Sequence, residues 1–212
     1  MFNLILGAIN TQAEYVIEAP YCNAFQPPPI SDLQATVSEQ DDTVQPGYEP
    51  ESVFECKYEL DSLGHFLALA NDFYEHTGSL DFLGPRWLLA LEALLKVLDE
   101  QSKPTFDEMG RYQRNAYTFQ RNTNTGTETL SLNGVGNPLN GSTGLVRSAF
   151  RPSDDATILG FLIPANAMMA AELRRTGAML EAASEKKLAR TVLEWSQRIA
   201  KAAWQHGVVR YN

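Results

Sequence analysis

Apolar residues recur every three or four positions over much of the chain, which is the spacing of one face of an α-helix. Three helices are predicted in this way, on Leu60, Leu63, Leu67, Ala70 and Tyr74, on Leu83, Trp87, Leu91, Leu94 and Leu98, and on Leu188, Val192, Trp195, Ile199 and Ala202. The turn at 76–79 makes the first two a helical hairpin, with Ser79 or Asp81 expected to cap the second helix. The third helix is expected to end at Gly207.

Further helices are predicted from local signals. Pro164 fits the first turn of a helix that runs to about Arg175. Residues 165–171 are apolar or small on nearly every side, which is typical of a helix buried all round. Such a helix belongs either to the inner ring of a two-layer helical barrel or to the centre of an ordinary core. Thr105 with Glu108 has the form of a capping box and predicts a shorter helix.

Two stretches lack the helical pattern. The stretch 19–50 holds six prolines and the acidic run 39–42, and is expected to be a long surface excursion. Between 115 and 150 apolar and polar residues alternate and glycines are frequent, which predicts a short hairpin or an extended loop. The fold class is therefore all-α with long extended loop insertions. Ordered loops of this length are usually functional.

Composition and charge narrow the possible partners. The 212 residues suit one domain or a large piece of one, and 26 acidic against 17 basic residues give a net charge of −9. Such a surface repels phosphates, so neither nucleic acid nor an anionic membrane is expected as a partner. No stretch is long and apolar enough for a membrane span. The start of the chain lacks a basic segment and reads as an amphipathic helix rather than a signal peptide.

Cysteine and histidine give no sign of a metal centre. Cys22 and Cys56 are too few for a thiolate zinc site, and two buried free thiols are favoured over a bridge. The three histidines, His65, His76 and His206, are far apart and are expected on helix surfaces or helix ends. Neither a metal nor a cofactor is predicted.

Carboxylates are the remaining candidates for chemistry. Asp154 and Asp155, flanked by Arg147 and Arg151, could supply an acid whose pKa is tuned by burial and a cationic neighbour. The alternative is that Ser153 caps a helix whose dipole the two acids offset. A second polar cluster, residues 57–62, lies at the start of the first hairpin helix and includes Lys57, Tyr58, Glu59, Asp61 and Ser62. In that cluster the alternative role is again helix capping.

Several motifs together identify a family. The block GLVRSAFRPSDDA at 144–156, followed by FLIPAN at 161–166, closely resembles glycoside hydrolase family 125, the metal-independent exo-α-1,6-mannosidases. Further matching segments lie at 4–12, 20–27, 54–63 and 119–121. The resemblance covers essentially the whole chain.

The resemblance implies an (α/α)6 barrel and hydrolysis with inversion, which needs a protonated acid and a carboxylate base. It places the general acid at Asp154 or Asp155 without deciding between them. The expected sugar-binding residues are Arg147, Arg151, Tyr58, Glu59 and Asp61, with an α-mannoside as the partner. Residues 1–212 are expected to be a partial catalytic domain that lacks its N-terminal start and its C-terminal portion. Because the expected base belongs to that C-terminal portion, the chain alone is expected to be inactive.

Other readings remain open at this point. The chain is alternatively a non-catalytic or degenerate helical protein that binds sugar, or a different (α/α)6 glycosidase or lyase. The sequon Asn140-Gly141-Ser142 is consistent with a secretory route but does not fix the compartment. Exposed inner helices predict a large apolar face and poor solubility.

Overall fold

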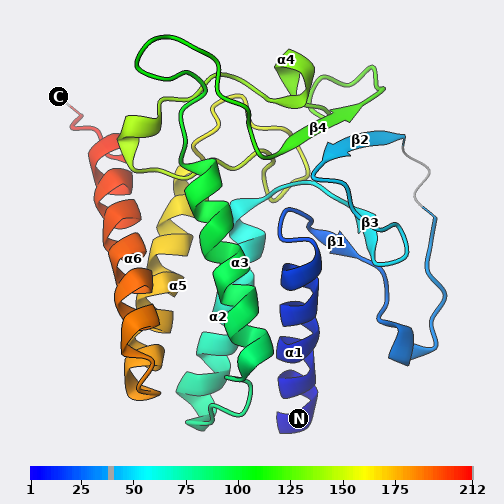
Figure 1. Ribbon diagram of the computed structural model, residues 1–212, viewed down its shortest axis with the longest axis vertical. Coiled ribbons are helices and arrows are strands. Elements are labelled where there is room, and N and C mark those ends of the chain that lie inside the picture. The colour runs from blue at the N-terminus through cyan, green and yellow to red at the C-terminus, as the bar shows by residue number, and fades with distance from the viewer. Residues whose placement is uncertain (38–40, 212) are drawn as a thin grey trace.

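The computed structural model of the protein describes residues 1–37 and 41–211. Within these ranges five long helices lie side by side along the long axis of the molecule (Figure 1), namely α1 (Phe2–Glu18), α2 (Leu60–Thr77), α3 (Pro85–Gln101), α5 (Ile163–Ala182) and α6 (Lys186–Gly207). Helix α1 packs on α2 and α3, and α5 packs on α2 and α6. The helices predicted from apolar periodicity are confirmed, and α5 continues beyond the expected end at Arg175.

The helices meet on the apolar faces that their periodicity predicts. The side chains of Leu67, Leu91, Leu94, Leu98 and Leu173 are fully buried between them. Removing these faces from water is the main favourable contribution to the fold.

Two local predictions about the helices are wrong. Helix α3 starts at Pro85 after Gly84, without a side-chain cap from Ser79 or Asp81. The second error concerns α5, where Ala167 and Ala171 are exposed, so this helix is not buried all round.

Short strands form within and beside the two stretches that lack the helical pattern, which are otherwise largely extended and, over 27–37 and 41–51, mostly exposed. Strand β1 (Ala24–Phe25) pairs with β3 (Val53–Glu55), and β2 (Asp42–Gln45) pairs with β4 (Thr118–Arg121), both antiparallel. The β2–β4 register runs from Asp42 opposite Arg121 to Gln45 opposite Thr118. The acidic stretch is therefore not wholly a surface feature, because the Asp42 side chain is buried against Arg121. Glu39 and Gln40 lie outside the described residues.

The capping box predicted at Thr105 and Glu108 is not formed. Instead, Asp107 accepts hydrogen bonds from the backbone N–H groups of Met109 and Arg111, both at 2.9 Å, and closes a tight turn. Gly110 supplies the left-handed backbone that this turn needs, with φ of +75°. The segment therefore forms a turn around Asp107 instead of a helix. Short polar side chains often compete with helix formation in this way by bonding to nearby backbone groups.

The prediction of two free thiols is also wrong, because Cys22 and Cys56 form a disulfide. The cause is the β1–β3 pairing, in which Ala24 lies opposite Glu55 and so brings the neighbouring cysteines together. The two cysteines are 34 residues apart in the sequence, and no sequence pattern indicates that they pair.

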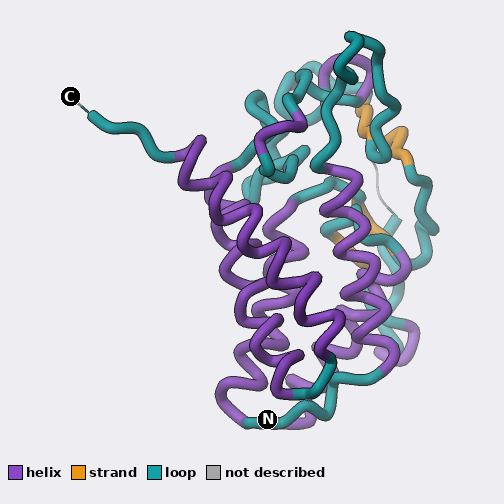
Figure 2. The backbone as a smooth tube through the Cα atoms, turned by 60° about the vertical axis from the view of Figure 1, so that its left-hand side comes forward, coloured by secondary structure: helices purple, strands orange, loops and turns teal. Residues whose placement is uncertain are grey.

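Most loops and short elements gather at one end of the helical layer, while β1, β3 and the segment that follows β1 lie beside α1 (Figure 1), and Figure 2 shows the helices forming most of the remaining body. Helices α1, α3 and α6 end there, and α2 and α5 begin there. Short α4 (Ser131–Gly134) also lies at this end. Every residue proposed from the sequence for catalysis or sugar binding therefore lies at or beside this end. In the described part of the chain no helix is long and apolar enough to cross a membrane.

Candidate functional site

The segment leading into α2 fixes the position of the loop that carries the two aspartates. The backbone N–H groups of Ala149 and Phe150 both donate to the Tyr58 carbonyl, at 3.1 and 2.9 Å. The N–H of Leu60 donates to the Ser148 hydroxyl at 2.9 Å. These buried bonds join two segments about 90 residues apart, so the loop that follows Phe150 is held beside the start of α2.

That loop is a tight turn rather than a helix start. A bridge between Phe150 and Ala156 closes it, and within it Asp154 donates its N–H to the Arg151 carbonyl at 2.8 Å. Asp154 has φ of +65°, a conformation that aspartate adopts more readily than most residues. Helix α5 begins only at Ile163, so the capping role considered for Ser153 and the two acids is wrong.

Asp154 lies between two polar side chains. Asn23 donates its amide N–H to Asp154 Oδ1 at 3.3 Å, and the Lys57 ammonium lies 3.7 Å from the same oxygen. The Asp154 side chain is 59% exposed whereas that of Lys57 is 6% exposed. One side of the Asp154 carboxylate is therefore fixed to the protein and the other faces solvent, where a ligand can approach it.

Glu59 is the carboxyl group with the most perturbed protonation in this region. Burial raises its pKa to about 7, and the negative charges of Asp61 and Asp154 add to the effect. Hydrogen bonds from Ser62 and Asn23 act in the opposite direction. Glu59 can therefore hold or release a proton near neutral pH, which is the property required of an acid or base group.

Asp61 lies in the first turn of α2 and is also buried. Its Oδ1 atom is enclosed and has no hydrogen-bond partner in the part of the chain that the structure describes. Buried acceptors are nearly always satisfied, so this enclosed oxygen is a position for an ordered water molecule.

Asp155 and Arg151 form a separate, exposed pair. Asp155 Oδ2 accepts from the Ser153 hydroxyl at 2.9 Å and lies 3.1 Å from the Arg151 guanidinium. Hydrogen bonds from Ser153 and Thr127 lower the pKa of Asp155, with Arg151 contributing in the same direction. Asp155 is thus held as a carboxylate, which is unfavourable for a proton donor.

Tyr58 and Arg147 are not at the surface of the described chain. Tyr58 packs against Tyr21 and Tyr117, and its burial raises its pKa well above the usual value. Arg147 is buried close to the same tyrosines, and this burial lowers its pKa. The structure therefore brings Glu59, Asp61 and Asp154 together at the α2 start, but places Tyr58 and Arg147 in the core beneath them.

Sequence reasoning gave neither Asn23 nor Lys57 a role in the site, although Lys57 belongs to the polar cluster at 57–62. Both lie in segments that match the family pattern, yet no motif connects them to Asp154. Lys57 is the one cation between Glu55 and Glu59, which is a signal that a sequence reader could have used.

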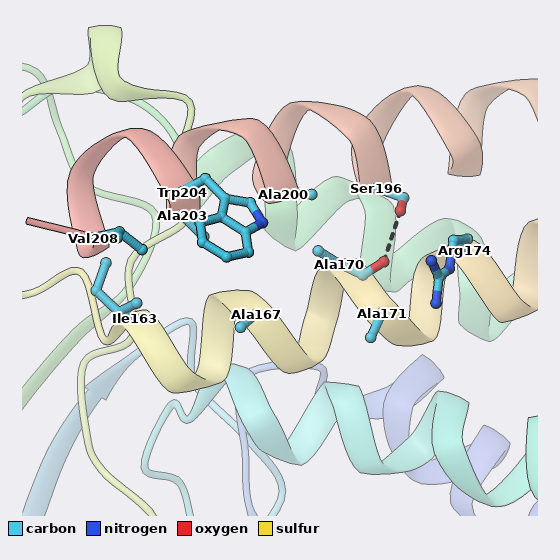
Figure 3. A pocket seen from close by; sticks show the side chains of 10 residues that line it. All are labelled: Ile163, Ala167, Ala170, Ala171, Arg174, Ser196, Ala200, Ala203, Trp204 and Val208. Atoms are coloured by element: carbon cyan, nitrogen blue, oxygen red, sulfur yellow. Dashed lines mark hydrogen bonds between the residues drawn. The ribbon is translucent and has the colours of Figure 1, made fainter.

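An apolar groove lies elsewhere, along α5 and α6 (Figure 3). Its volume is about 370 Å³, and Trp204 covers part of it while remaining 72% exposed. Ala167, Ala171 and Ala200 form its shallow floor, and none of the candidate polar residues lines it.

Within residues 1–37 and 41–211 no group of three or more His, Cys, Asp or Glu side chains is arranged to hold a metal. The three histidines lie on the exposed surface of α2 or in the last turns of α2 and α6, as predicted.

Comparison with known proteins gives consistent matches. A family model described as metal-independent α-mannosidase matches residues 1–212. The meiotically up-regulated gene 157 protein of Schizosaccharomyces pombe is 53% identical over 207 residues, which are 97% of this chain and 41% of that protein. A solved metal-independent α-mannosidase of Streptococcus pneumoniae, in a non-productive complex with α-1,6-mannobiose, superposes with a TM-score of 0.74 and 26% identity. That match covers 96% of this chain and 43% of the solved one, so the chain spans less than half the length of either.

Proposed function

The chain belongs to glycoside hydrolase family 125, the metal-independent α-mannosidases. We propose that it is the part of an inverting, exo-acting α-1,6-mannosidase that supplies the general acid. On this proposal its helices form part of an (α/α)6 barrel, and the loop end of the helical layer is the floor of the sugar site. The observation that carries the proposal is the cluster of Asp154, Glu59 and Asp61 at the start of α2.

Asp154 is the proposed general acid. Its carboxyl group lies beside Glu59 and is open to solvent, whereas Asp155 is turned toward Arg151 and Ser153 and is held ionised. In an inverting glycosidase this acid protonates the leaving oxygen while a base on the other face of the sugar activates water. Glu59, whose pKa of about 7 leaves it partly protonated near neutral pH, lies beside Asp154 and can hold a proton within the site.

Asp61 is the proposed hydroxyl-binding residue. Its carboxylate lies in the first turn of α2 beside Glu59, where a carboxylate oxygen can accept a hydrogen bond from a mannose hydroxyl. The proposed contributions of Arg147, Arg151 and Tyr58 are of a different kind. Arg151 holds Asp155, while Tyr58 and Arg147 support the loop and the α2 start from below.

The test of this function uses a chimera in which this chain replaces the matching segment of the Schizosaccharomyces pombe relative. We expect release of mannose from α-1,6-mannobiose, with β-mannose as the first anomer seen by NMR, as inversion requires. Asp154→Asn should lower release by about 10²–10⁴-fold, the usual contribution of a general acid. Asp155→Asn is the matched control and should lower release much less.

Three outcomes would contradict the proposal. Full turnover in Asp154→Asn would remove Asp154 from the acid role, and loss in Asp155→Asn alone would transfer that role to its neighbour. Binding of mannobiose without any release by the chimera, while the parent relative is active, would favour a non-catalytic sugar-binding protein.

A further inference from the structure

Asn23 and Lys57, which both contact Asp154, are also hydrogen-bonded to each other. The side-chain oxygen of Asn23 accepts the backbone N–H of Lys57 at 3.0 Å, while the other end of the same amide group donates to Asp154. Lys57 and Asn23 thus act on one carboxylate oxygen as a joined pair. Any movement of one segment relative to the other would break at least one of these contacts.

Each member of the pair directly follows a cysteine of the disulfide. Cys22 precedes Asn23, and Cys56 precedes Lys57. Among residues 1–37 and 41–211, the regular backbone pairing beside them is the β1–β3 ladder, which is short and has an irregular register. Ladders this short are marginal by themselves and fix register weakly. The covalent bond is therefore the firmest link between the two segments.

The Lys57 side chain is held in place by further charges. Its ammonium lies 3.4 Å from Glu55, and Glu55 in turn pairs with Arg121 at 2.5 Å. Arg121 pairs with Asp42 at 2.6 Å, and all four side chains are largely buried. The ammonium also lies 5.6 Å from the centre of the Phe150 ring. This chain of alternating charges directs the Lys57 ammonium toward Asp154 and restricts other orientations.

We propose that the Cys22–Cys56 disulfide positions Asp154 by keeping Asn23 and Lys57 in the one arrangement in which both contact its carboxylate. Asn23 and Lys57 are then positioning residues, and the disulfide is a local clamp on the site. The proposal rests on the proposed function only for the importance of Asp154, because the contacts themselves do not depend on catalysis.

Opening the clamp requires a dithiol reductant such as dithiothreitol. Two electrons and two protons pass from its thiols to the Cys22–Cys56 bond, which becomes two thiols while the reductant closes into a cyclic disulfide. The β1–β3 ladder then remains as the local link, and the Asn23 and Lys57 contacts to Asp154 are expected to be lost.

The experiment compares the oxidised and reduced chain, labelled with ¹³C and ¹⁵N, by NMR. In the oxidised chain we expect a nuclear Overhauser effect between the side-chain amide protons of Asn23 and the β protons of Asp154. Reduction should abolish this effect and shift the backbone amide signal of Lys57. The Arg111 amide signal is the internal control, because its bond to Asp107 lies in a different turn and should not change.

A Cys22→Ser/Cys56→Ser variant separates the clamp from side effects of the reductant. It should lack the Asn23–Asp154 effect from the start and show no change on addition of dithiothreitol. Persistence of that effect after reduction would overturn the proposal. So would its loss together with the Arg111 signal, because the disulfide would then hold the whole fold rather than the site.

The outcome for the clamp is independent of the outcome for the proposed function. If reduction releases Asp154 while Asp154→Asn leaves mannose release intact, the clamp stands and the acid assignment falls. If the contacts survive reduction while Asp154→Asn abolishes release, the clamp is wrong and the acid assignment stands.

Discussion

Glu59 illustrates how a single buried carboxyl group affects both stability and chemistry. Its pKa is about 7 in the folded chain, against 4.5 for the unperturbed group, with burial as the main cause. Between these two values the folded chain binds more protons than the unfolded chain. The free energy of unfolding therefore falls as the pH rises through this window.

The pH dependence of stability tests this account of Glu59. Glu59→Gln removes the titrating group, so the variant should gain stability relative to the wild type as the pH rises from 4.5 to 7. Above pH 7 the difference should level off. Urea unfolding of both proteins at several pH values measures it, with Glu92→Gln on exposed α3 surface as the control. A constant difference across the window would show that Glu59 is not perturbed.

At the residue scale, some site residues could be predicted and others could not. Glu59, Asp61 and Asp154 were identified because carboxylates in motif blocks are natural candidates. The contacts of Asn23 and Lys57 with Asp154 were not predicted, because they depend on the β1–β3 pairing between segments more than 30 residues apart. Tyr58 and Arg147 were expected to line the sugar site, but periodicity and motifs say nothing about the depth at which a side chain lies in a non-helical segment.

At the scale of elements, long helices and short strands differ in how far the sequence reveals them. The helices repeat one apolar spacing over 17 residues or more, so local sequence is sufficient. Strands β2 and β4 are four residues each, and their pairing joins Asp42 to a partner 79 residues away. The ion pair between Asp42 and Arg121 adds a side-chain link to this backbone pairing, and no local pattern predicts it.

Arg121 is expected to be essential for the β2–β4 pairing. Its side chain is 6% exposed and contacts both Asp42 and Glu55. Arg121→Met would leave two buried carboxylates with less compensation, so we expect a loss of about 3–5 kcal/mol in the free energy of unfolding. The control is Lys103→Met, since Lys103 forms an exposed pair with Asp99 and should cost less than about 1 kcal/mol. Equal effects of the two substitutions in urea unfolding would contradict this account.

At the scale of the whole molecule, the notable feature is the uncovered apolar face of α5 and α6. Small side chains at Ala167, Ala171 and Ala200 leave a groove, and Trp204 covers part of it while remaining largely exposed (Figure 3). Exposed apolar surface of this kind lowers solubility. The sequence analysis expected an apolar face, although it placed α5 in a fully buried position.

This face should bind a hydrophobic dye. We expect the chain to enhance the fluorescence of anilinonaphthalene sulfonate, and Ala167→Glu to reduce that enhancement by placing a charge in the groove. Ala178→Glu is the matched control, because Ala178 is exposed on the same helix but does not line the groove. An equal reduction by both substitutions, or by neither, would locate the apolar surface elsewhere.

The central claim is that Glu59, Asp61 and Asp154, at the loop end of the helical layer, form a mannoside site. The most direct test is a titration of the ¹⁵N-labelled chain with α-1,6-mannobiose, followed by NMR. We predict that the amide signals of these three residues and of Asn23 shift progressively, while signals from the α5–α6 groove stay in place. Saturable shifts confined to the groove, or no shifts at millimolar sugar, would contradict the claim.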